Sequence, residues 1–256
     1  MKNSPLVSWI LAIHNNESTI EKCITSLLNQ TYKNFEIIII NDCSTDRTKE
    51  VLKKFGCNFK NKIKIFNNHK ILGLAASLNK AICLSNGEYL ARIDGDDYVV
   101  NDRLEKQVNY LNDNTEISVV GSNAFLIKKN SIIGKTNLNR KKNIFFKSYK
   151  YHYPLSIIHP TTLIRRSFFN DVGLYDEELI RAQDQDLWLR GLLRKKKFHI
   201  LDHDLIYFNQ SNYSLSKTFL IFKCCIWISI KNNCFWELFF WNLASLFVNI
   251  YRKINN

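Results

Sequence analysis

The sequence Tyr89-Leu90-Ala91-Arg92-Ile93-Asp94-Gly95-Asp96-Asp97 decides the fold, because a largely apolar run leads directly into three carboxylates. A short apolar run is typical of a buried strand, and open α/β sheets bind their ligands at the carboxyl ends of such strands. The carboxylates repel one another, and a divalent cation that also binds phosphate oxygens would relieve that repulsion. A solvated acidic turn stays open as the alternative. An EF-hand calcium loop is excluded, because Val99 stands where its sharp-turn glycine belongs.

The residues around this stretch alternate between apolar runs and amphipathic segments. Strands are predicted at 6–13, 35–40 and 63–66, and apolar residues recur at helical spacing at 20–28, 51–55 and 74–84. Gly87 is expected to end the last of these helices. Such an alternation predicts a mostly parallel sheet with right-handed crossovers. The polar residues Asn15, Asp42 and 94–97 then gather at one edge of the sheet.

The composition describes a globular chain of 256 residues, with 46% hydrophobic and 23% charged side chains, which is long enough to bury a sizeable core. None of its eight glycines stands in GxG spacing, so a phosphate would be held by a metal and side chains instead of a glycine loop. The seven cysteines contain no CxxC pair, which favours neither a zinc site nor a disulfide framework. We therefore expect a reducing cytoplasm, and the apolar strand that follows residues 1–5 is too short for a signal peptide.

The positive charge is concentrated in the second half. Residues 128–256 carry 21 basic and 9 acidic side chains of a chain whose net charge is +13. This asymmetry predicts an anionic partner, either a nucleic acid or a membrane surface, and a scattered lysine-rich surface is the alternative. The basic runs at 140–142 and 194–197 belong to no recognisable nucleic-acid module, so we expect no nucleic-acid partner. A non-catalytic nucleic-acid-binding domain nevertheless stays open as the second hypothesis.

Several blocks of the chain resemble glycosyltransferase family 2 of GT-A fold, namely 7–15, 26–32, 35–46, 73–81, 94–96, 159–161, 173–177 and 183–190. The resemblance covers roughly residues 4–210. It implies an α/β fold of GT-A type, with a Rossmann-like, mostly parallel nucleotide-binding sheet, an acceptor-side α/β part and C-terminal helices. The implied domains are a glycosyltransferase domain at 1–216, with a nucleotide-sugar half at 1–115 and an acceptor half at 116–216, and an amphipathic helical tail at 217–256.

The resemblance also implies roles on the donor side. Ala12 and Asn15 would lie beside the nucleotide, and Asp42 would accept a hydrogen bond from its base. Asp94 would approach the ribose or the metal, and Asp96 would bind a divalent cation, Mn2+ or Mg2+. The chain departs from the family pattern at positions 41 and 43, where Asn41 replaces an acidic residue and Cys43 replaces a glycine, so the base specificity stays open.

On the acceptor side, Asp184 matches the aspartate that deprotonates the acceptor hydroxyl in inverting members. His159, Asp186 and Trp188 are weaker candidates for contact with the acceptor or a phosphate. Each has a structural alternative: an ordinary helical face for the two aspartates, a turn for His159 and the core for Trp188. The pattern QxxRW does not follow Trp188, which implies a non-processive enzyme.

The implied activity is a hexosyl or N-acetylhexosaminyl transfer in the synthesis of a cell-surface polysaccharide. The donor would be a nucleotide sugar, with a UDP-sugar favoured, and the acceptor would be a glycan or a lipid-linked glycan. The variable stretch at 130–155 is expected to select the acceptor.

The tail is rich in aromatic and apolar residues. Its runs at 218–230 and 235–251 are each shorter than the roughly 20 residues that a membrane crossing needs. Aromatic residues beside lysines predict peripheral membrane contact through 218–253, with the protein on the inner face of the cytoplasmic membrane. Helices packed on the catalytic core or against a second copy in a homodimer are the alternative.

Overall fold

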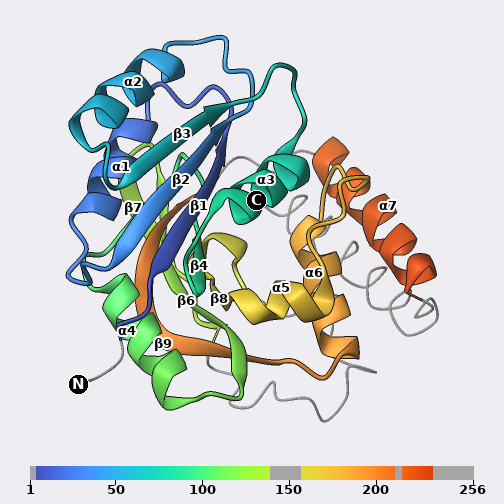
Figure 1. Cartoon of the computed structure of the whole chain (residues 1–256). Coiled ribbons are helices and arrows are strands. Elements are labelled where there is room, and N and C mark those ends of the chain that lie inside the picture. Colours follow the sequence, from blue (N-terminus) through green and yellow to red (C-terminus); the bar gives the residue numbers. More distant parts are fainter. Residues whose placement is uncertain (1–3, 139–156, 211–214, 233–256) are drawn as a thin grey trace.

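The computed structural model describes residues 4–138, 157–210 and 215–232, which form a mixed α/β sheet with helices on both faces (Figure 1). The strands lie in the order β3-β2-β1-β4-β8-β6-β9-β5, and β7 pairs with β6. The first half of the chain contributes β1 (Val7–Ile13), α1 (Ile20–Leu28), β2 (Phe35–Asn41), α2 (Thr48–Asn58), β3 (Ile63–Asn67), α3 (Leu74–Leu84) and β4 (Tyr89–Arg92). These four strands pair in parallel, which confirms the sheet predicted from the sequence.

The second half of the chain extends the same sheet. It contributes β5 (Tyr98–Val99), α4 (Arg103–Asp113), β6 (Ile117–Lys128), β7 (Ser131–Lys135), η2 (His159–Thr161), β8 (Leu163–Arg165), α5 (Arg166–Val172), α6 (Gln183–Leu193), β9 (Lys197–Asn209) and α7 (Leu215–Lys231). Strand β8 is antiparallel to both β4 and β6 and lies between them. The two expected halves of the domain therefore share one sheet.

Both faces of the sheet are covered, which is why its central strands are continuous apolar runs. Ile10 and Ile38 pack in a core cluster with residues of α3, α5, α6 and α7. Trp9 and Ile37 point to the other face and pack with α1, α2 and α4. The acidic turn therefore follows a strand, β4, whose side chains pack into the core clusters on both faces of the sheet.

The prediction that Gly87 ends the third helix was wrong. Helix α3 ends at Leu84, and its C-cap is Ser85 in an extended conformation. A Cβ atom on Gly87 would lie 2.5 Å from the backbone nitrogen of Ser8. The glycine is therefore required for the close approach of this loop to β1.

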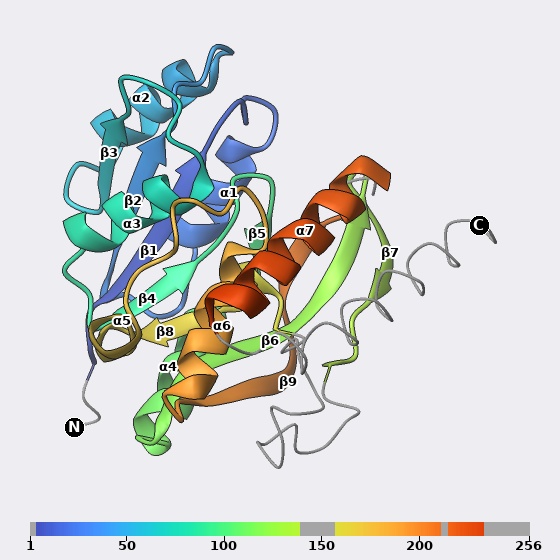
Figure 2. The same cartoon turned by 90° about the vertical axis from the view of Figure 1, so that its right-hand side faces the viewer.

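Helix α7 lies beside α6 in both views (Figures 1 and 2). Its residues Cys225 and Ile228 are buried in the same core cluster as Trp188, and Lys231 Nζ lies 2.6 Å from an oxygen of Asp176. The inner face of α7 is thus part of the core, and the helix begins at Leu215, just before the boundary expected at residue 217. The remainder of the expected tail, 233–256, and most of the variable stretch, 139–155, lie outside the described residues.

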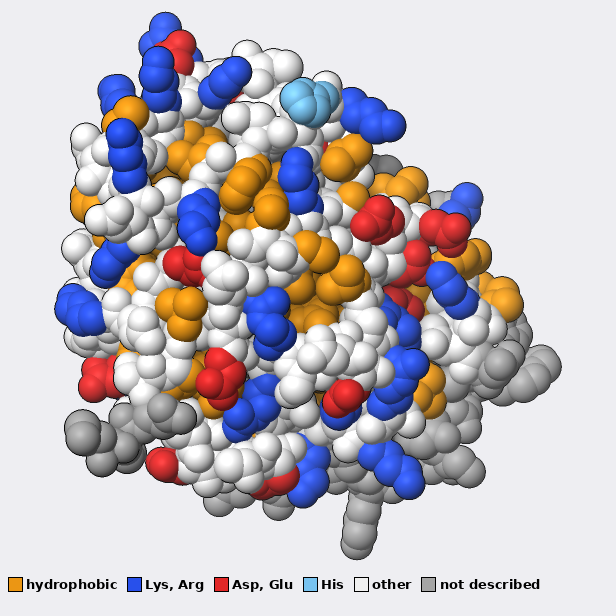
Figure 3. All heavy atoms as spheres, viewed as in Figure 1, with side chains coloured by type: hydrophobic (Ala, Val, Ile, Leu, Met, Phe, Trp, Pro, Cys, Tyr) orange, Lys and Arg blue, Asp and Glu red, His pale blue; other side chains and the backbone are white. Residues whose placement is uncertain are grey.

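The described helices include none that is both long and apolar enough to cross a membrane. Lysine and arginine side chains are spread over the face seen in Figure 3, where polar and apolar side chains separate them. On that face the positive charge is scattered.

Candidate active site

The acidic turn packs tightly against the end of β1. A Cβ atom on Gly95 would lie 2.9 Å from Cγ2 of Ile13, so a larger residue would push the turn away from this strand. One carboxylate oxygen each from Asp94, Asp96 and Asp97 lie within 4.8 Å of one another. Burial and the charge of Asp94 raise the pKa of Asp96, and the same two causes raise the pKa of Asp97 well above its ordinary value. The turn therefore concentrates negative charge where water is partly excluded.

A buried arginine, Arg92, balances part of this charge. Its side chain is 3% exposed and donates two hydrogen bonds to the Asp94 carboxylate, one of 2.6 Å from Nη1 to Oδ2 and the other from Nη2 to Oδ1. Such a two-bond pair fixes the direction of the carboxylate as well as its charge. Sequence reasoning missed this role, although a single arginine in an apolar run is itself a signal, because arginine is rarely buried unless it is paired.

The carboxylates of the turn suit a hard divalent cation, for which oxygen ligands are preferred. Asp97 Oδ2 is buried and has no hydrogen-bond partner among the described residues. Asp96 receives one long bond of 3.3 Å from Asn209, and Asp94 is bound to Arg92. The ligand oxygens still available within the described site are therefore mainly those of Asp96 and Asp97. The sequence indicated Asp94 and Asp96 as metal ligands and Asp97 only as a member of the acidic cluster, and it gave no sign of Asn209, which comes from the end of β9.

Asp184 is the second residue of α6, whose N-cap Ala182 has a left-handed backbone (φ 60°, ψ 26°). Burial raises the pKa of Asp184, the charge of Arg92 and a hydrogen bond from the Gln185 backbone lower it, and the charge of Asp94 raises it. These interactions place Asp184 near the acidic turn, with Arg92 acting on both. The structure thus brings together a candidate base and the candidate metal ligands.

The weaker candidates on the acceptor side are buried. Asp186 accepts a 2.8 Å hydrogen bond from Arg190 Nε, and its side chain is only 2% exposed. Trp188 is 1% exposed in the core. His159 Nε2 lies 2.7 Å from the hydroxyl of Tyr175, and burial together with the charge of Arg92 lowers its pKa well below the usual range. Asp186 and Trp188 therefore have structural roles, and His159 is a buried, neutral residue paired with Tyr175.

The donor-side candidates collect at the ends of β1 and β2. Ala12 is half-buried, and Asn15 is exposed with a left-handed φ of 54°. The Asp42 carboxylate accepts hydrogen bonds from the backbone nitrogens of Leu72 (2.9 Å) and Gly73 (2.8 Å) and from the side chain of Asn68 (2.8 Å). Because a carboxylate has about four acceptor positions, Asp42 shapes the loop before α3 and keeps about one position for a ligand.

A mostly parallel sheet with an acidic turn after a central strand, beside a helix with a carboxylate in its first turn, defines a GT-A glycosyltransferase fold. S. aureus TarS, solved in complex with UDP-GlcNAc, matches with a TM-score of 0.69 and 21% identity over 88% of this chain and 65% of that chain. Mannosyltransferase PcManGT from Pyrobaculum calidifontis, solved with GDP-Man and Mn2+, matches with a TM-score of 0.68 and 16% identity over 90% of this chain and 64% of that one. The chain thus spans about two thirds of these solved chains, and the likeness shows the fold.

The glycosyl transferase family 2 profile matches residues 8–173, and the chain belongs to this family. It is 32% identical to an uncharacterized glycosyltransferase of Methanocaldococcus jannaschii, over 94% of this chain and 88% of the relative. It is 31% identical to the putative glycosyltransferase EpsE of Bacillus subtilis, over 88% of this chain and 84% of the relative.

Proposed function

We propose that the chain is an inverting glycosyltransferase that moves a hexosyl or N-acetylhexosaminyl group from a nucleotide-diphosphate sugar to a hydroxyl of a glycan or lipid-linked acceptor. The observation that carries this proposal is that the charges of Arg92 and of Asp94 in the acidic turn both act on Asp184 in a family 2 chain. TarS with UDP-GlcNAc and PcManGT with GDP-Man and Mn2+ support a nucleotide-sugar donor and a divalent metal. A UDP-sugar donor and a role in the synthesis of a cell-surface polysaccharide complete the proposal.

The donor would bind over the ends of the parallel strands. Ala12, Asn15 and the remaining acceptor position of Asp42 would contact the nucleoside. Asp96 would hold Mn2+ or Mg2+ together with Asp94, whose oxygens the cation would share with Arg92. The bound cation would stabilise the negative charge that develops on the leaving diphosphate.

Asp184 would act as the base. Its carboxylate would accept the proton of the acceptor hydroxyl, whose oxygen then bonds to the anomeric carbon while the bond to the diphosphate breaks. Attack from the face opposite the leaving group inverts the anomeric centre, by the same geometry as in inverting hydrolysis. Arg92 supports this role, because its charge lowers the pKa of Asp184 against the effect of burial.

The test is the release of UDP or GDP from a panel of UDP- and GDP-sugars with Mn2+ or Mg2+, measured with and without candidate glycan acceptors. Asp184→Asn is the base variant. Asp186→Asn is the matched control, because Asp186 lies two residues further along the same helical turn but is paired with Arg190. Thermal melting checks that both variants fold. Failure of every donor to bind or release its nucleotide would refute the proposal.

We further propose peripheral membrane contact through α7 and the residues that follow it, within 218–253, on the inner face of the cytoplasmic membrane. Support comes from the outer face of α7, where Trp227 is 39% and Ile230 55% exposed, with the exposed Lys223 beside them and Lys231, which is paired with Asp176, at the end of the helix. An aromatic residue between lysines suits the boundary between headgroups and acyl chains.

Sedimentation with anionic vesicles tests this contact. The double variant Trp227→Ser/Ile230→Ser should bind vesicles more weakly. The matched control is Ile132→Ser/Ile133→Ser on β7, because these side chains are similarly exposed at 56% and 54%. Equal vesicle binding by both variants and the wild type would exclude this face, and a dimer broken by the α7 variant in sedimentation analysis would assign it to a second copy.

A further inference from the structure

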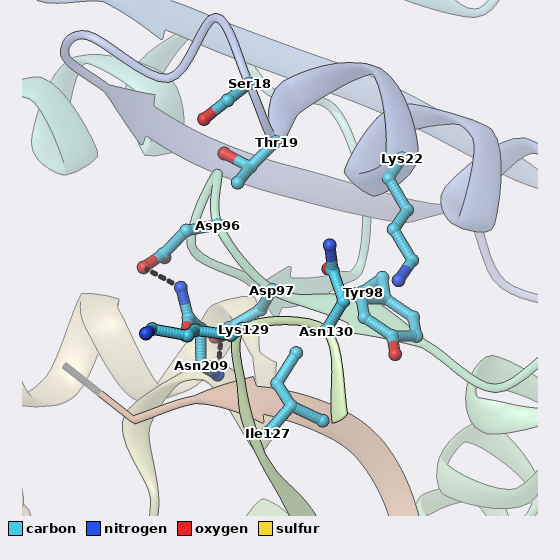
Figure 4. Close-up of a pocket in the computed structure, with 10 residues that line it drawn as sticks. All are labelled: Ser18, Thr19, Lys22, Asp96, Asp97, Tyr98, Ile127, Lys129, Asn130 and Asn209. Atoms are coloured by element: carbon cyan, nitrogen blue, oxygen red, sulfur yellow. Dashed lines mark hydrogen bonds between the residues drawn. The ribbon is translucent and has the colours of Figure 1, made fainter. Parts of the chain in front are cut away.

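The end of β9 faces the acidic turn across a pocket of about 240 Å³ (Figure 4). Asn209, the last residue of this strand, lines the pocket together with Asp96 and Asp97. Figure 4 shows the side chains of Asp96 and Asn209 pointing toward each other, one from the acidic turn and the other from the strand. The pocket has room for a cation with several water ligands, since a water molecule takes about 30 Å³ in the liquid.

The backbone of Asn209 is held from two sides. Its nitrogen donates a 2.7 Å hydrogen bond to Oδ1 of the buried Asp97. On the other side Asn209 pairs with Ile127 of β6, and the next backbone nitrogen, that of Gln210, donates to the carbonyl oxygen of Ile127 at 3.0 Å. Because these contacts use the backbone, they keep Asn209 beside Asp96 whichever way its side-chain amide is turned.

The contact between the Asn209 side chain and Asp96 is a poor hydrogen bond. Nδ2 of Asn209 lies 3.3 Å from Oδ2 of Asp96, beyond the range of about 2.7–3.2 Å for ordinary N–H···O bonds. Half a turn about the Cβ–Cγ bond exchanges the amide nitrogen with the amide oxygen. Two adjacent oxygen ligands of an octahedral Mg2+ ion are about 3.0 Å apart, because each lies about 2.0–2.1 Å from the ion. After this turn, the two side chains would present oxygens at nearly the spacing of neighbouring ligands.

The acidic turn itself offers few oxygens to a cation. Both oxygens of Asp94 accept hydrogen bonds from Arg92, and Oδ1 of Asp97 accepts one from Asn209. Side-chain amide oxygens are ligands of hard divalent cations in proteins. An amide oxygen is uncharged, so it adds a ligand without adding to the repulsion among the three carboxylates.

Two lysines, Lys22 and Lys129, also line the pocket. Their charges disfavour a bare cation and favour one that carries phosphate oxygens, because an ammonium group donates hydrogen bonds to such oxygens. The diphosphate of the proposed donor meets this condition. Metal binding is therefore measured with UDP present.

We propose that Asn209 is a ligand of the divalent cation, bound through its side-chain oxygen next to Asp96, and that Asp97 positions it. The inference rests on the proposed function, which supplies the cation, and it extends the metal site from the acidic turn to the end of β9. It also gives the third carboxylate of the turn a role, because Asp97 binds the backbone of the ligand residue and not the cation.

Three variants separate a metal ligand from a simple hydrogen-bond donor. Asn209→Ala removes the amide and keeps the backbone nitrogen that Asp97 binds. Asn209→Asp keeps an oxygen at the same place along the side chain. Asn130→Gly is the matched control, because it removes another amide of the pocket and glycine accepts the left-handed φ of 64° at that position. Melting curves without metal check that each variant folds.

The experiment titrates the full chain with Mn2+ in the presence of UDP and follows binding by EPR. Line broadening in water enriched in the magnetic isotope of oxygen counts the water ligands of Mn2+. Asn209→Ala should bind Mn2+ at least about tenfold more weakly than the wild type and show one more water ligand, since even residues that only support a ligand contribute about 10–100-fold to metal affinity. Asn209→Asp should bind at least as tightly with the wild-type number of waters. Asn130→Gly should match the wild type in both respects.

A mere donor would give different results. If the Asn209 amide only donates to Asp96, it competes with the cation, so Asn209→Ala would bind Mn2+ equally well or more tightly, and Asn209→Asp would displace a water ligand. Either result would overturn the inference and leave the proposed function intact. Weaker binding by Asn209→Ala without an additional water would also overturn it, because the residue would then act from outside the ligand shell. If the wild type binds no Mn2+, the inference fails, and the release of UDP or GDP from nucleotide sugars decides the proposed function separately.

Discussion

Replacing Arg92 by methionine should destabilise the protein through the carboxylate that it leaves behind. Arg92 is 3% exposed and its partner Asp94 is 30% exposed. Removing one partner of a fully buried ion pair costs about 3–5 kcal/mol, and the partial exposure of Asp94 reduces this to about 2–3 kcal/mol. For a chain of this length, each kcal/mol lowers the melting temperature by about 2–4 °C, so we expect Arg92→Met to melt about 4–12 °C below the wild type without metal.

Mn2+ should recover part of this loss. In the wild type both oxygens of Asp94 accept hydrogen bonds from Arg92, so a cation competes with the guanidinium for them. In Arg92→Met these oxygens are free, and their repulsion with Asp96 and Asp97 favours a cation. If the affinity for Mn2+ rises about tenfold, saturating Mn2+ adds about 1.4 kcal/mol of stability beyond its effect on the wild type. The assay is a melting curve across a series of Mn2+ concentrations.

Arg165→Met is the control for this experiment. Arg165 is a half-buried arginine whose acceptors are uncharged: backbone carbonyl oxygens, with 2.7 Å from its Nε to the oxygen of Ile117, and the Tyr89 hydroxyl. Its loss should lower the melting temperature and leave the response to Mn2+ unchanged. The reasoning would be refuted if Arg92→Met and Arg165→Met responded to Mn2+ alike.

Three further predictions concern the same site. Asp96→Ala should abolish the thermal shift with Mn2+ and the metal-dependent release of nucleotide, and the metal-free variant should be no less stable, because the pKa of Asp96 is raised by burial and by the charge of Asp94. Asp184→Asn should lower kcat/KM by about 10²-fold or more with UDP affinity unchanged in calorimetry, and near-normal turnover would move the base elsewhere. Burial raises the pKa of Asp184 and the base must be ionised, so the loss of kcat/KM on acidification should begin at a higher pH than an ordinary aspartate would give. Arg92→Met should move this loss to still higher pH, because it removes the charge that lowers the pKa of Asp184. An unchanged pH profile would contradict the role of Arg92.

The first half of the fold was predictable because its central strands β1, β2 and β4 are buried on both faces. The runs at 35–40 and 63–66 match β2 and β3 to within a residue, and the helix predicted at 74–84 coincides with α3. Continuous apolar runs between caps carry this information locally. The role of Gly87 was not local, because it depends on the approach of Ser8 from a strand about eighty residues earlier.

The second half of the fold was less accessible from the sequence. β6 and β9 run side by side in parallel with register shifts at Ile117/Val119, Ser122/Asn123 and Asn123/Ala124, so their apolar residues follow no single period. The site residues divide in the same way. Asp94, Asp96 and Asp184 stand in motifs that can be recognised, whereas Asn209 supports Asp97 from 112 positions away, a pairing that no spacing in the sequence predicts.

The reversed strand β8 explains why motifs from both halves of the chain can meet. β8 is antiparallel to β4, so the residues that precede it lie at the edge of the sheet where β4 ends. The backbone nitrogen of Arg92 donates to the carbonyl oxygen of Thr162, and Arg103 from α4 donates to the carbonyl oxygens of both Arg92 and Thr162. One buried guanidinium thus joins the acidic turn to the segment that carries His159, from the sheet face opposite α6. Arg103→Lys keeps the positive charge but lacks the guanidinium that donates to both carbonyl oxygens, so it should shift the position of the acidic turn more than it changes the charge around that turn.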